Sequence, residues 1–294
     1  MIRGTTAPDS SGRESKHLPN CSGQPRPPKR RKRRMITAGV DVGAATAKTV
    51  IVADGSILSY AVMPTGDSVA RAAEKVTGAA LKQARLSMPD LGFIISTGYG
   101  RNAVAFAHKA VTEIICHAKG VNFLIPAART VIDIGGQDSK VIGVREDGTV
   151  SDFVMNDKCA AGTGRFLEVM AGVLGLDIEE MGAISLTSKE PCNISSTCTI
   201  FAETEMVSLR ADGRTRQDMV AGIHKAVASR VVVMGRTVGY RQQVVFTGGV
   251  AKNLGVKHSL EVGIGLPILI PEEPQIVGAL GGALLAIREL SILR

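Results

Sequence analysis

One arrangement of strands and turns occurs twice along this sequence, and it restricts the folds that the chain can adopt. The first copy has three apolar runs typical of strands, at residues 36–42, 48–53 and 57–63. A helix that begins after Asp67 or Ser68 follows it, and a fourth strand is predicted at 92–96. The second copy restarts near residue 126, with strand-like runs at 130–134, 140–144 and 150–155. We therefore predict an α/β fold in which two similar domains face each other across a cleft.

The first strand of each copy ends in an aspartate that is followed by a glycine turn. Backbone N–H groups in such a turn can face phosphate oxygens, and a lysine or hydroxyl beside it adds to the binding. One turn of this kind is typical of an ordinary β-hairpin, but two in tandem favour a phosphate site. The residues assigned to phosphates are Gly43, Ala44, Ala45, Thr46 and Lys48 from the first turn, and Gly135 and Gly136 from the second.

Polar side chains beside the two turns are candidates for catalysis. Carboxylates can hold Mg²⁺ through water, and an amide can orient an attacking water. Asp41 is the candidate for Mg²⁺, bound through water. Gln137 is the candidate for orienting water, with Asp133 and Asp138 beside it.

A third glycine turn completes the pattern of a nucleotide site. An apolar strand at 244–246 opens onto Thr247, Gly248 and Gly249, where the backbone can lie against a nucleoside. Gln275 is a further candidate for this part of the site. Two phosphate turns followed by a glycine turn, in this order, predict an ATP site.

The remaining helices and the domain boundaries follow from apolar spacing and turn residues. Helices are predicted at residues 110–120, 165–174, 178–181, 199–209, 216–238, 253–262 and 275–290. The predicted domains are residues 35–125, completed by a C-terminal helix at 275–294, and residues 126–274. Small residues such as Gly278 and Gly281 in the last helix predict close backbone packing.

Two cysteines lie in turns that precede predicted helices. Cys159 belongs to a glycine-rich segment at 156–164, and Cys198 to a hydroxyl-rich segment at 195–199. A thiolate at a helix N-terminus is well placed to bind a metal cluster, and two such ligands per chain suggest a cluster shared by two chains. Cys116 lies in an apolar helix and is expected to be a core residue. Cys192 is a possible substitute ligand.

The net charge of +8 comes from the first 34 residues, which hold ten Lys and Arg against two acidic residues. The other residues hold 25 basic and 25 acidic groups, so we expect no nucleic-acid binding by the folded body. Residues 1–34 are predicted to be a disordered basic tail. They could be a nuclear-localisation-like or nucleic-acid-binding arm, a solvated tail, or an upstream extension; we expect Met35 to begin the functional protein.

A membrane or secreted location is not indicated by the sequence. No window reaches about 18 uninterrupted apolar residues, and no signal-peptide pattern is present at the N-terminus. The five cysteines form no regular disulfide framework. We expect a cytoplasmic protein.

The three turns, in this order, resemble those of the actin, sugar-kinase and Hsp70 ATPases. A closer resemblance, over residues 36–286, is to the activators of 2-hydroxyacyl-CoA dehydratases and the ATPase subunits of benzoyl-CoA reductases. The segments that carry it are residues 41–48, 113–120, 133–142, 156–170, 195–205 and 247–251. The resemblance implies two actin-like (RNase H-like) domains around an ATP cleft.

It also implies a 4Fe–4S cluster that Cys159 and Cys198 would bind across a homodimer, together with ATP and Mg²⁺. The implied function is an oxygen-sensitive, ATP-dependent electron donor. A ferredoxin or flavodoxin would reduce the cluster, and a 2-hydroxyacyl-CoA dehydratase would accept the electron. Ala44 and Ala45 depart from the family, which usually has hydroxyl residues in the first turn.

Other functions stay open from the sequence. A benzoyl-CoA reductase ATPase subunit would share the cluster, whereas a sugar or acyl kinase would share the ATP site and leave the cysteines without a role. A structural or nucleic-acid-binding role would depend on the tail. Glu113 and His117 lie one helical turn apart, and we expect them to have a structural role or to lie near the interdomain hinge.

Overall fold

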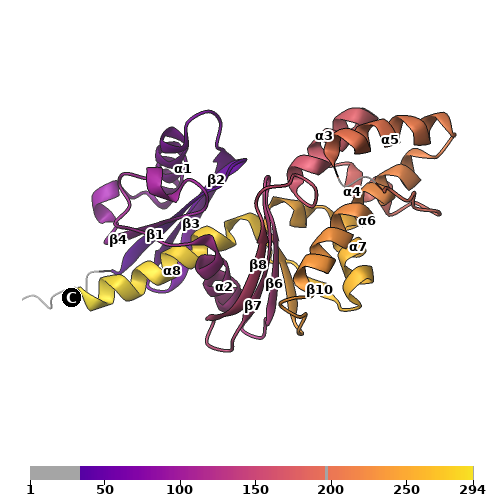
Figure 1. The fold of residues 1–294 in the computed structure, drawn as a ribbon. Helices are drawn as coiled ribbons and strands as arrows, with labels where there is room; N and C mark the ends of the chain where they lie inside the picture. Colours follow the sequence, from indigo (N-terminus) through magenta and orange to yellow (C-terminus); the bar gives the residue numbers. More distant parts are fainter. Residues whose placement is uncertain (1–33, 196–197, 294) are drawn as a thin grey trace, which may run out of the picture. The chain divides into compact units, whose positions relative to one another are not determined.

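The computed structural model of the protein describes residues 34–195 and 198–293 (Figure 1). Within this part of the chain the backbone forms two five-stranded sheets, each accompanied by helices. The tail predicted at residues 1–34 lies outside the described residues except for Arg34, whose guanidinium pairs with Asp54 at 3.2 Å.

The first sheet has the strand order β3-β2-β1-β4-β5. Its strands are β1 (Ile36–Val42), β2 (Thr46–Ala53), β3 (Ser56–Pro64), β4 (Phe93–Thr97) and β5 (Lys109–Ala110). The first three form an antiparallel meander, and β4 and β5 continue the sheet in parallel with β1. Helix α1 (Val69–Ala84), capped by the Ser68 hydroxyl, buries its apolar face against this sheet.

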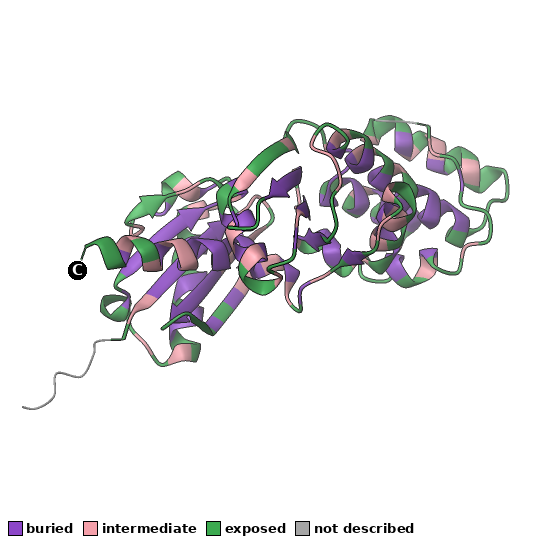
Figure 2. Ribbon diagram, turned by 90° about the horizontal axis from the view of Figure 1, so that it is seen from below, coloured by how far each residue is buried: buried purple, intermediate pink, exposed green. Residues whose placement is uncertain are grey.

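The second sheet repeats this layout with the order β10-β9-β6-β7-β8. Its strands are β6 (Thr130–Ile134), β7 (Ser139–Val144), β8 (Val150–Asn156), β9 (Val244–Thr247) and β10 (Ile268–Leu269). Again three antiparallel strands are extended by two parallel ones. The strands that begin each copy, β1 and β6, are buried along almost their whole length. Figure 2 shows buried strands in purple. The repeat predicted from the sequence is therefore present.

The other helices supply most of the remaining core residues. They are α2 (Glu113–Leu124), α3 (Gly164–Leu174), α4 (Met181–Ser185), α5 (Thr199–Ala211), α6 (Arg216–Gly235), α7 (Leu254–Ile264) and α8 (Val277–Ile292). The largest buried cluster joins α3, α6 and α7 to β6 and β9, around Phe166 and Phe246. This cluster holds the second sheet and its helices together.

Helix α8 packs closely against β1 and α2, as its small residues predicted. A Cβ atom at Gly281 would clash with the carbonyl oxygen of Cys116, and a Cβ atom at Gly39 would clash with that of Ala279. Residues Pro274–Ile292, which comprise α8 and the turn before it, are the stretch in the described part of the chain that is long and apolar enough to cross a membrane. Since 56% of that stretch is buried in the protein, its apolar composition suits a core helix.

Several predicted boundaries differ from the structure. The helix predicted at 110–120 begins at Glu113, because Lys109 and Ala110 pair with β4 as a short strand. The short helix predicted at 178–181 is α4, which begins at Met181. Helix α6 ends at Gly235 rather than at residue 238, and the Tyr240 hydroxyl donates to the carbonyls of Val231 and Val232 there.

Candidate functional site: a nucleotide cavity and two exposed cysteines

A cavity of about 560 Å³ is lined by turns from both sheets and by α2. This volume is in the range that holds a small-molecule cofactor. The residues assigned above to nucleotide, water or Mg²⁺ line it, with the exception of Thr247, although they are spread from Asp41 to Gln275. The cavity brings together Asp41, Gly43, Ala44, Ala45, Thr46, Lys48, Asp133, Gly135, Gly136, Gln137, Asp138, Gly248, Gly249 and Gln275.

The first turn places a lysine beside the aspartate that ends β1. Asp41 and Lys48 are direct partners in the β1–β2 register, and their side-chain atoms Oδ2 and Nζ are 3.4 Å apart. The N–H of Gly43 donates to the carbonyl of Thr46 at 3.0 Å and closes the turn. Ala44 and Ala45, at its tip, therefore present backbone and methyl groups to the cavity. Phosphate contacts from this turn would come from backbone N–H groups, Thr46 and Lys48.

The two turns approach each other closely at Ala45 and Gly136. A Cβ atom at Gly136 would lie 2.6 Å from the Cβ atom of Ala45, well inside normal contact distance. Residue 136 therefore has to be glycine while residue 45 carries a methyl group. Ala45 is thus part of a tight steric fit between the first and second turns.

The second turn repeats the aspartate–lysine pair in a more buried form. Asp133 and Lys140 are direct partners in the β6–β7 register, and Lys140 Nζ lies 3.3 Å from Asp133 and 2.7 Å from Asp138. Burial alone would lower the pKa of Lys140, but the two carboxylates raise it above its ordinary value. Lys140 is therefore a fixed positive charge beneath the turn.

The two aspartates around Lys140 have opposite pKa shifts. Burial works to raise the pKa of Asp133, but His117, Lys140 and a hydrogen bond from Thr247 lower it to about 2. For Asp138, burial and the negative charge of Asp133 outweigh Lys140, so its pKa is raised. Asp133 is thus the permanently ionised carboxylate, and Asp138 is the one whose proton is held more tightly.

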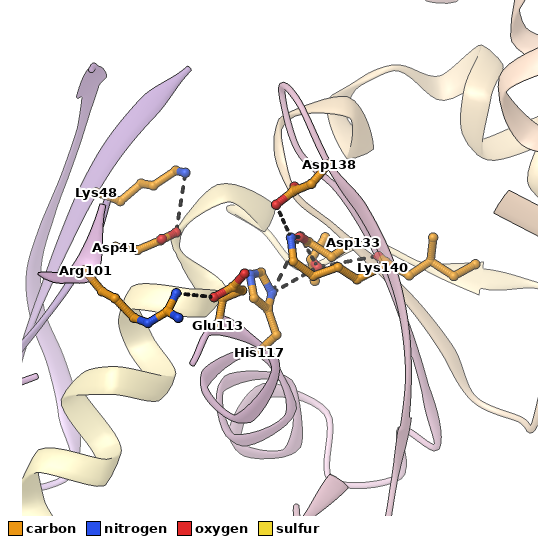
Figure 3. Close-up of polar contacts among 10 residues, drawn as sticks. Asp41, Lys48, Arg101, Glu113, His117, Asp133, Asp138 and Lys140 are labelled. Atoms are coloured by element: carbon orange, nitrogen blue, oxygen red, sulfur yellow. Dashed lines mark hydrogen bonds and ion pairs between the residues drawn. The ribbon is translucent and has the colours of Figure 1, made fainter. Parts of the chain in front are cut away.

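Helix α2 contributes Glu113 and His117, for which the sequence predicts a structural role or a place near the interdomain hinge. Glu113 pairs with Arg101 at 3.3 Å, and His117 Nδ1 lies 3.6 Å from Asp133 Oδ1, as Figure 3 shows. Both residues line the cavity. Lys140 was also missed as a site residue. Its position seven residues after Asp133, matching Lys48 after Asp41, is the signal that could have identified it.

The glycine turn after β9 completes the cavity wall. Gly248 has φ of +88° and its N–H donates to the carbonyl of Pro274 at 3.1 Å. This bond holds the turn against residues 274–276, which include Gln275. A Cβ atom at Gly249 would lie 3.3 Å from Gln275 Nε2, so the bare glycine backbone and this amide share one side of the cavity.

The four cysteines of the described residues divide into two classes. Cys116 and Cys192 are buried, and burial raises the pKa of Cys116 to about 12. Cys159 and Cys198 are exposed, and neither is among the described residues that line the cavity. Of these four cysteines, only the exposed pair is open to a ligand that is bound by thiolates.

The two exposed cysteines are held differently. Cys198 is the N-cap of α5, as predicted. After Cys159, the helix predicted at 165–174 is α3, which begins at Gly164 after a turn at Gly162 with φ of +88°. The Asn156 side chain holds this turn through bonds to the backbone of Cys159 and Ala161.

Comparison with known proteins places this architecture. The profile of the BadF/BadG/BcrA/BcrD ATPase family matches residues 38–286. The activator of 2-hydroxyisocaproyl-CoA dehydratase from Clostridioides difficile is 44% identical over 261 residues, which cover 87% of this chain and 96% of that protein.

Two solved structures agree with the fold. The crystal structure of component A of the (R)-2-hydroxyglutaryl-CoA dehydratase of Acidaminococcus fermentans superimposes with a TM-score of 0.85 at 43% identity, over 87% of this chain and 99% of that one. The Clostridium difficile activator with bound ADPNP gives 0.83 at 42% identity, over 88% and 97%. These matches confirm the predicted actin-like α/β fold, and the chain belongs to the BadF/BadG/BcrA/BcrD ATPase family.

Proposed function

We propose that this protein is an ATP-dependent electron donor that activates a 2-hydroxyacyl-CoA dehydratase. The observation that carries the proposal is the presence of two exposed cysteines, Cys159 and Cys198, on the fold of an ATPase family whose similar members are activators of such dehydratases. A kinase of similar fold would have no use for this pair. A cytoplasmic homodimer is the form in which we expect the protein to act.

The residues present fit a 4Fe–4S cluster shared by two chains. Such a cluster takes four thiolate ligands, and the described part of each chain has two exposed thiols. Among the described residues, no three His, Cys, Asp or Glu side chains converge as a metal site, so a second copy would complete the set. When bound, the cluster would supply a one-electron carrier of low potential.

Positive charge near each cysteine supports this assignment. Cys198 stands at the start of α5, where the helix dipole favours an anion. On α6, Arg230 is close enough to Cys159 for the thiolate to oppose the lowering of the Arg230 pKa by burial. The same guanidinium lies 5.7 Å from the centre of the Phe166 ring.

Hydrogen bonds link the second phosphate turn directly to the start of α3, which follows the Cys159 segment. The N–H of Gly164 donates to the carbonyl of Gly135 at 2.9 Å, and that of Arg165 to Gly136 at 2.7 Å. Any movement of this turn with the nucleotide would shift the start of α3 and the loop before it. ATP can drive such a change only if it binds two arrangements with different affinity.

A second connection runs from α6 to the segment before Cys198. The Asp218 carboxylate accepts hydrogen bonds from Ser188, Lys189 and Glu190, and the Asp218 carbonyl accepts one from the Cys192 N–H. These hydrogen bonds hold residues 188–192, which precede Cys198 in the chain, against α6. Helix α6 therefore contacts residues 188–192, which precede the Cys198 segment, and it also carries Arg230 near Cys159.

Within the cavity we assign the turns at residues 43–46 and 135–137 to the phosphates, with Lys48 as a charge. Asp41 would hold Mg²⁺ through water, and Gln137 would orient the attacking water beside Asp133 and Asp138. Gly248, Gly249 and Gln275 would contact the adenosine. Ferredoxin or flavodoxin is the expected reductant.

Anaerobic purification with iron and sulfide analysis and EPR tests the electron-transfer reading. Wild type should hold about four irons per dimer. Cys159→Ala and Cys198→Ala should lose them, whereas the buried Cys192→Ala should keep them as the matched control. An iron-free, air-stable ATPase, or iron lost only in Cys192→Ala, would overturn the proposal.

A further inference from the structure

His117 is a buried side chain of the nucleotide cavity to which the assignments above give no role. The residue is 6% exposed and lies one turn after Glu113 on α2. Its two ring nitrogens face different groups. Nδ1 faces Thr247 and Asp133, while Nε2 faces α8 at Gly278.

The hydrogen bonds around Thr247 assign the proton on His117. The Thr247 hydroxyl lies 2.8 Å from Asp133 Oδ1, and an ionised carboxylate only accepts, so the hydroxyl hydrogen points to Asp133. His117 Nδ1 lies 3.3 Å from the same hydroxyl oxygen. Because the single hydroxyl hydrogen of Thr247 is already directed to Asp133, the Thr247 oxygen can only accept a hydrogen bond from His117. Nδ1 of His117 therefore carries a hydrogen. The direction of the network is His117 to Thr247 to Asp133.

This network holds Oδ1 of the Asp133 carboxylate, at the end of β6, while Lys140 holds the other oxygen. Lys140 contacts Asp133 Oδ2 at 3.3 Å, and the Thr247 hydroxyl contacts Oδ1. Asp133 and Thr247 are direct partners in the β6–β9 register, so the strands set their spacing. The orientation of the Thr247 hydroxyl depends on what faces it from α2.

Helix α8 fixes the other side of the imidazole. A Cβ atom at Gly278 would lie 3.0 Å from His117 Nε2 and 3.2 Å from Asp41 Oδ2. The ring therefore lies beside the aspartate of the first turn while it donates toward the aspartate of the second. Figure 3 shows His117 between the two aspartate–lysine pairs.

We propose that His117 is a positioning residue for ATP hydrolysis. Its Nδ1–H orients the Thr247 hydroxyl, and this hydroxyl fixes the Asp133 carboxylate that faces the phosphates. The inference rests on the ATP-hydrolysis part of the proposed function and does not depend on electron transfer. Loss of the Nδ1–H should lower the rate of the chemical step more than it weakens nucleotide binding.

Two amide substitutions separate the two ring nitrogens. In His117→Asn the amide nitrogen can occupy the place of Nδ1, and in His117→Gln it reaches toward the place of Nε2. We expect Gln to lower kcat for ATP hydrolysis about tenfold or more with KM for ATP within about threefold, and Asn to stay within about threefold of wild type. Melting temperatures and ADPNP binding of both variants report folding.

A double variant tests the route through Thr247. Thr247→Val removes the hydroxyl and should lower kcat as His117→Gln does. If His117 acts through Thr247, the double variant should be no slower than Thr247→Val alone by more than about twofold. Equal losses in His117→Asn and His117→Gln, no loss in either, or multiplied losses in the double variant would overturn the proposal. Hydrolysis is measured on the full chain without a dehydratase, so a failure of the electron-transfer reading would leave this result unchanged.

Discussion

The two halves of the nucleotide cavity carry the same aspartate–lysine pair, but they surround it differently. In the first half, Lys48 has one carboxylate partner, Asp41. In the second half, Lys140 lies between two carboxylates, and only 3% of its side chain is exposed. The second pair is therefore part of a three-charge cluster, in which Asp133 and Lys140 are buried and Asp138 is partly exposed.

The turns above the pairs also differ in what they contact. Carbonyls of the first turn, at Gly43 and Ala45, accept hydrogen bonds from Thr65, just after the end of β3. Carbonyls of the second turn accept from Gly164 and Arg165, at the start of α3. The same local motif thus closes a meander in one half, and in the other it links the nucleotide cavity to the Cys159 segment.

Replacing each lysine by methionine should expose the largest difference between the halves. Lys140→Met leaves the buried Asp133 without its lysine and beside the partly exposed Asp138, so the free energy of unfolding should fall by about 4 kcal/mol. Lys48→Met leaves one carboxylate and should cost about 2 kcal/mol. Urea unfolding of both variants under anaerobic conditions measures this. Equal losses would mean that the two pairs are energetically equivalent.

Acid should affect the second half through His224 on α6. Burial lowers the pKa of this imidazole to about 4, whereas its ordinary value is 6.5. Between pH 6.5 and pH 4 the unfolded chain therefore binds a proton at His224 that the folded chain does not bind. The free energy of unfolding should fall as the pH drops through this range. The shift corresponds to about 3 kcal/mol between pH 6.5 and pH 4.

His224→Asn is the control for this pH dependence. Without the imidazole, unfolding free energy should change much less between pH 6.5 and pH 4, even if the variant is less stable overall. His108, which accepts a hydrogen bond from the Ile94 N–H in the first half, is the matched position for substitution. A similar flattening in a His108→Asn variant would argue that the acid sensitivity is not specific to the second half.

The steric fit between the two turns provides a smaller, reversible test. Gly136→Ala would place a methyl group 2.6 Å from that of Ala45 and push the turns apart. We expect KM for ATP to rise about tenfold. Ala45→Gly in the same chain should restore it, because the clash then disappears. Failure of this rescue would show that Gly136 is needed for another reason, such as its backbone conformation.

Much of the nucleotide cavity could be predicted from local patterns. Strand ends, glycine turns and the spacing from Asp41 to Lys48 are set by neighbours in the chain, so they are visible without the fold. Glu113 and His117 could not be placed in this way. Their i, i+4 spacing suits any exposed or buried helix face, and only the packing of α2 against α8 turns this face toward Asp133.

Helix beginnings were predicted less well where a competing contact decides them. Residues 109–110 extend the first sheet instead of joining α2, because β4 offers them hydrogen bonds. The start of α3 was predicted to within one residue, because Gly162, whose φ is +88°, marks a turn just before it. Such outcomes depend on partners elsewhere in the chain or on one backbone angle.

The sequence by itself determined the repeated strand-and-turn unit, the three glycine turns and the cysteines that precede helices, because each depends on residues close together in the chain. The tertiary structure alone decided which cysteines are exposed, how Lys140 became buried between two carboxylates, and which carbonyls of the second turn reach α3. These features arise where segments far apart in the chain meet. Burial and charge act on the assembled neighbours, which no single segment of the sequence contains.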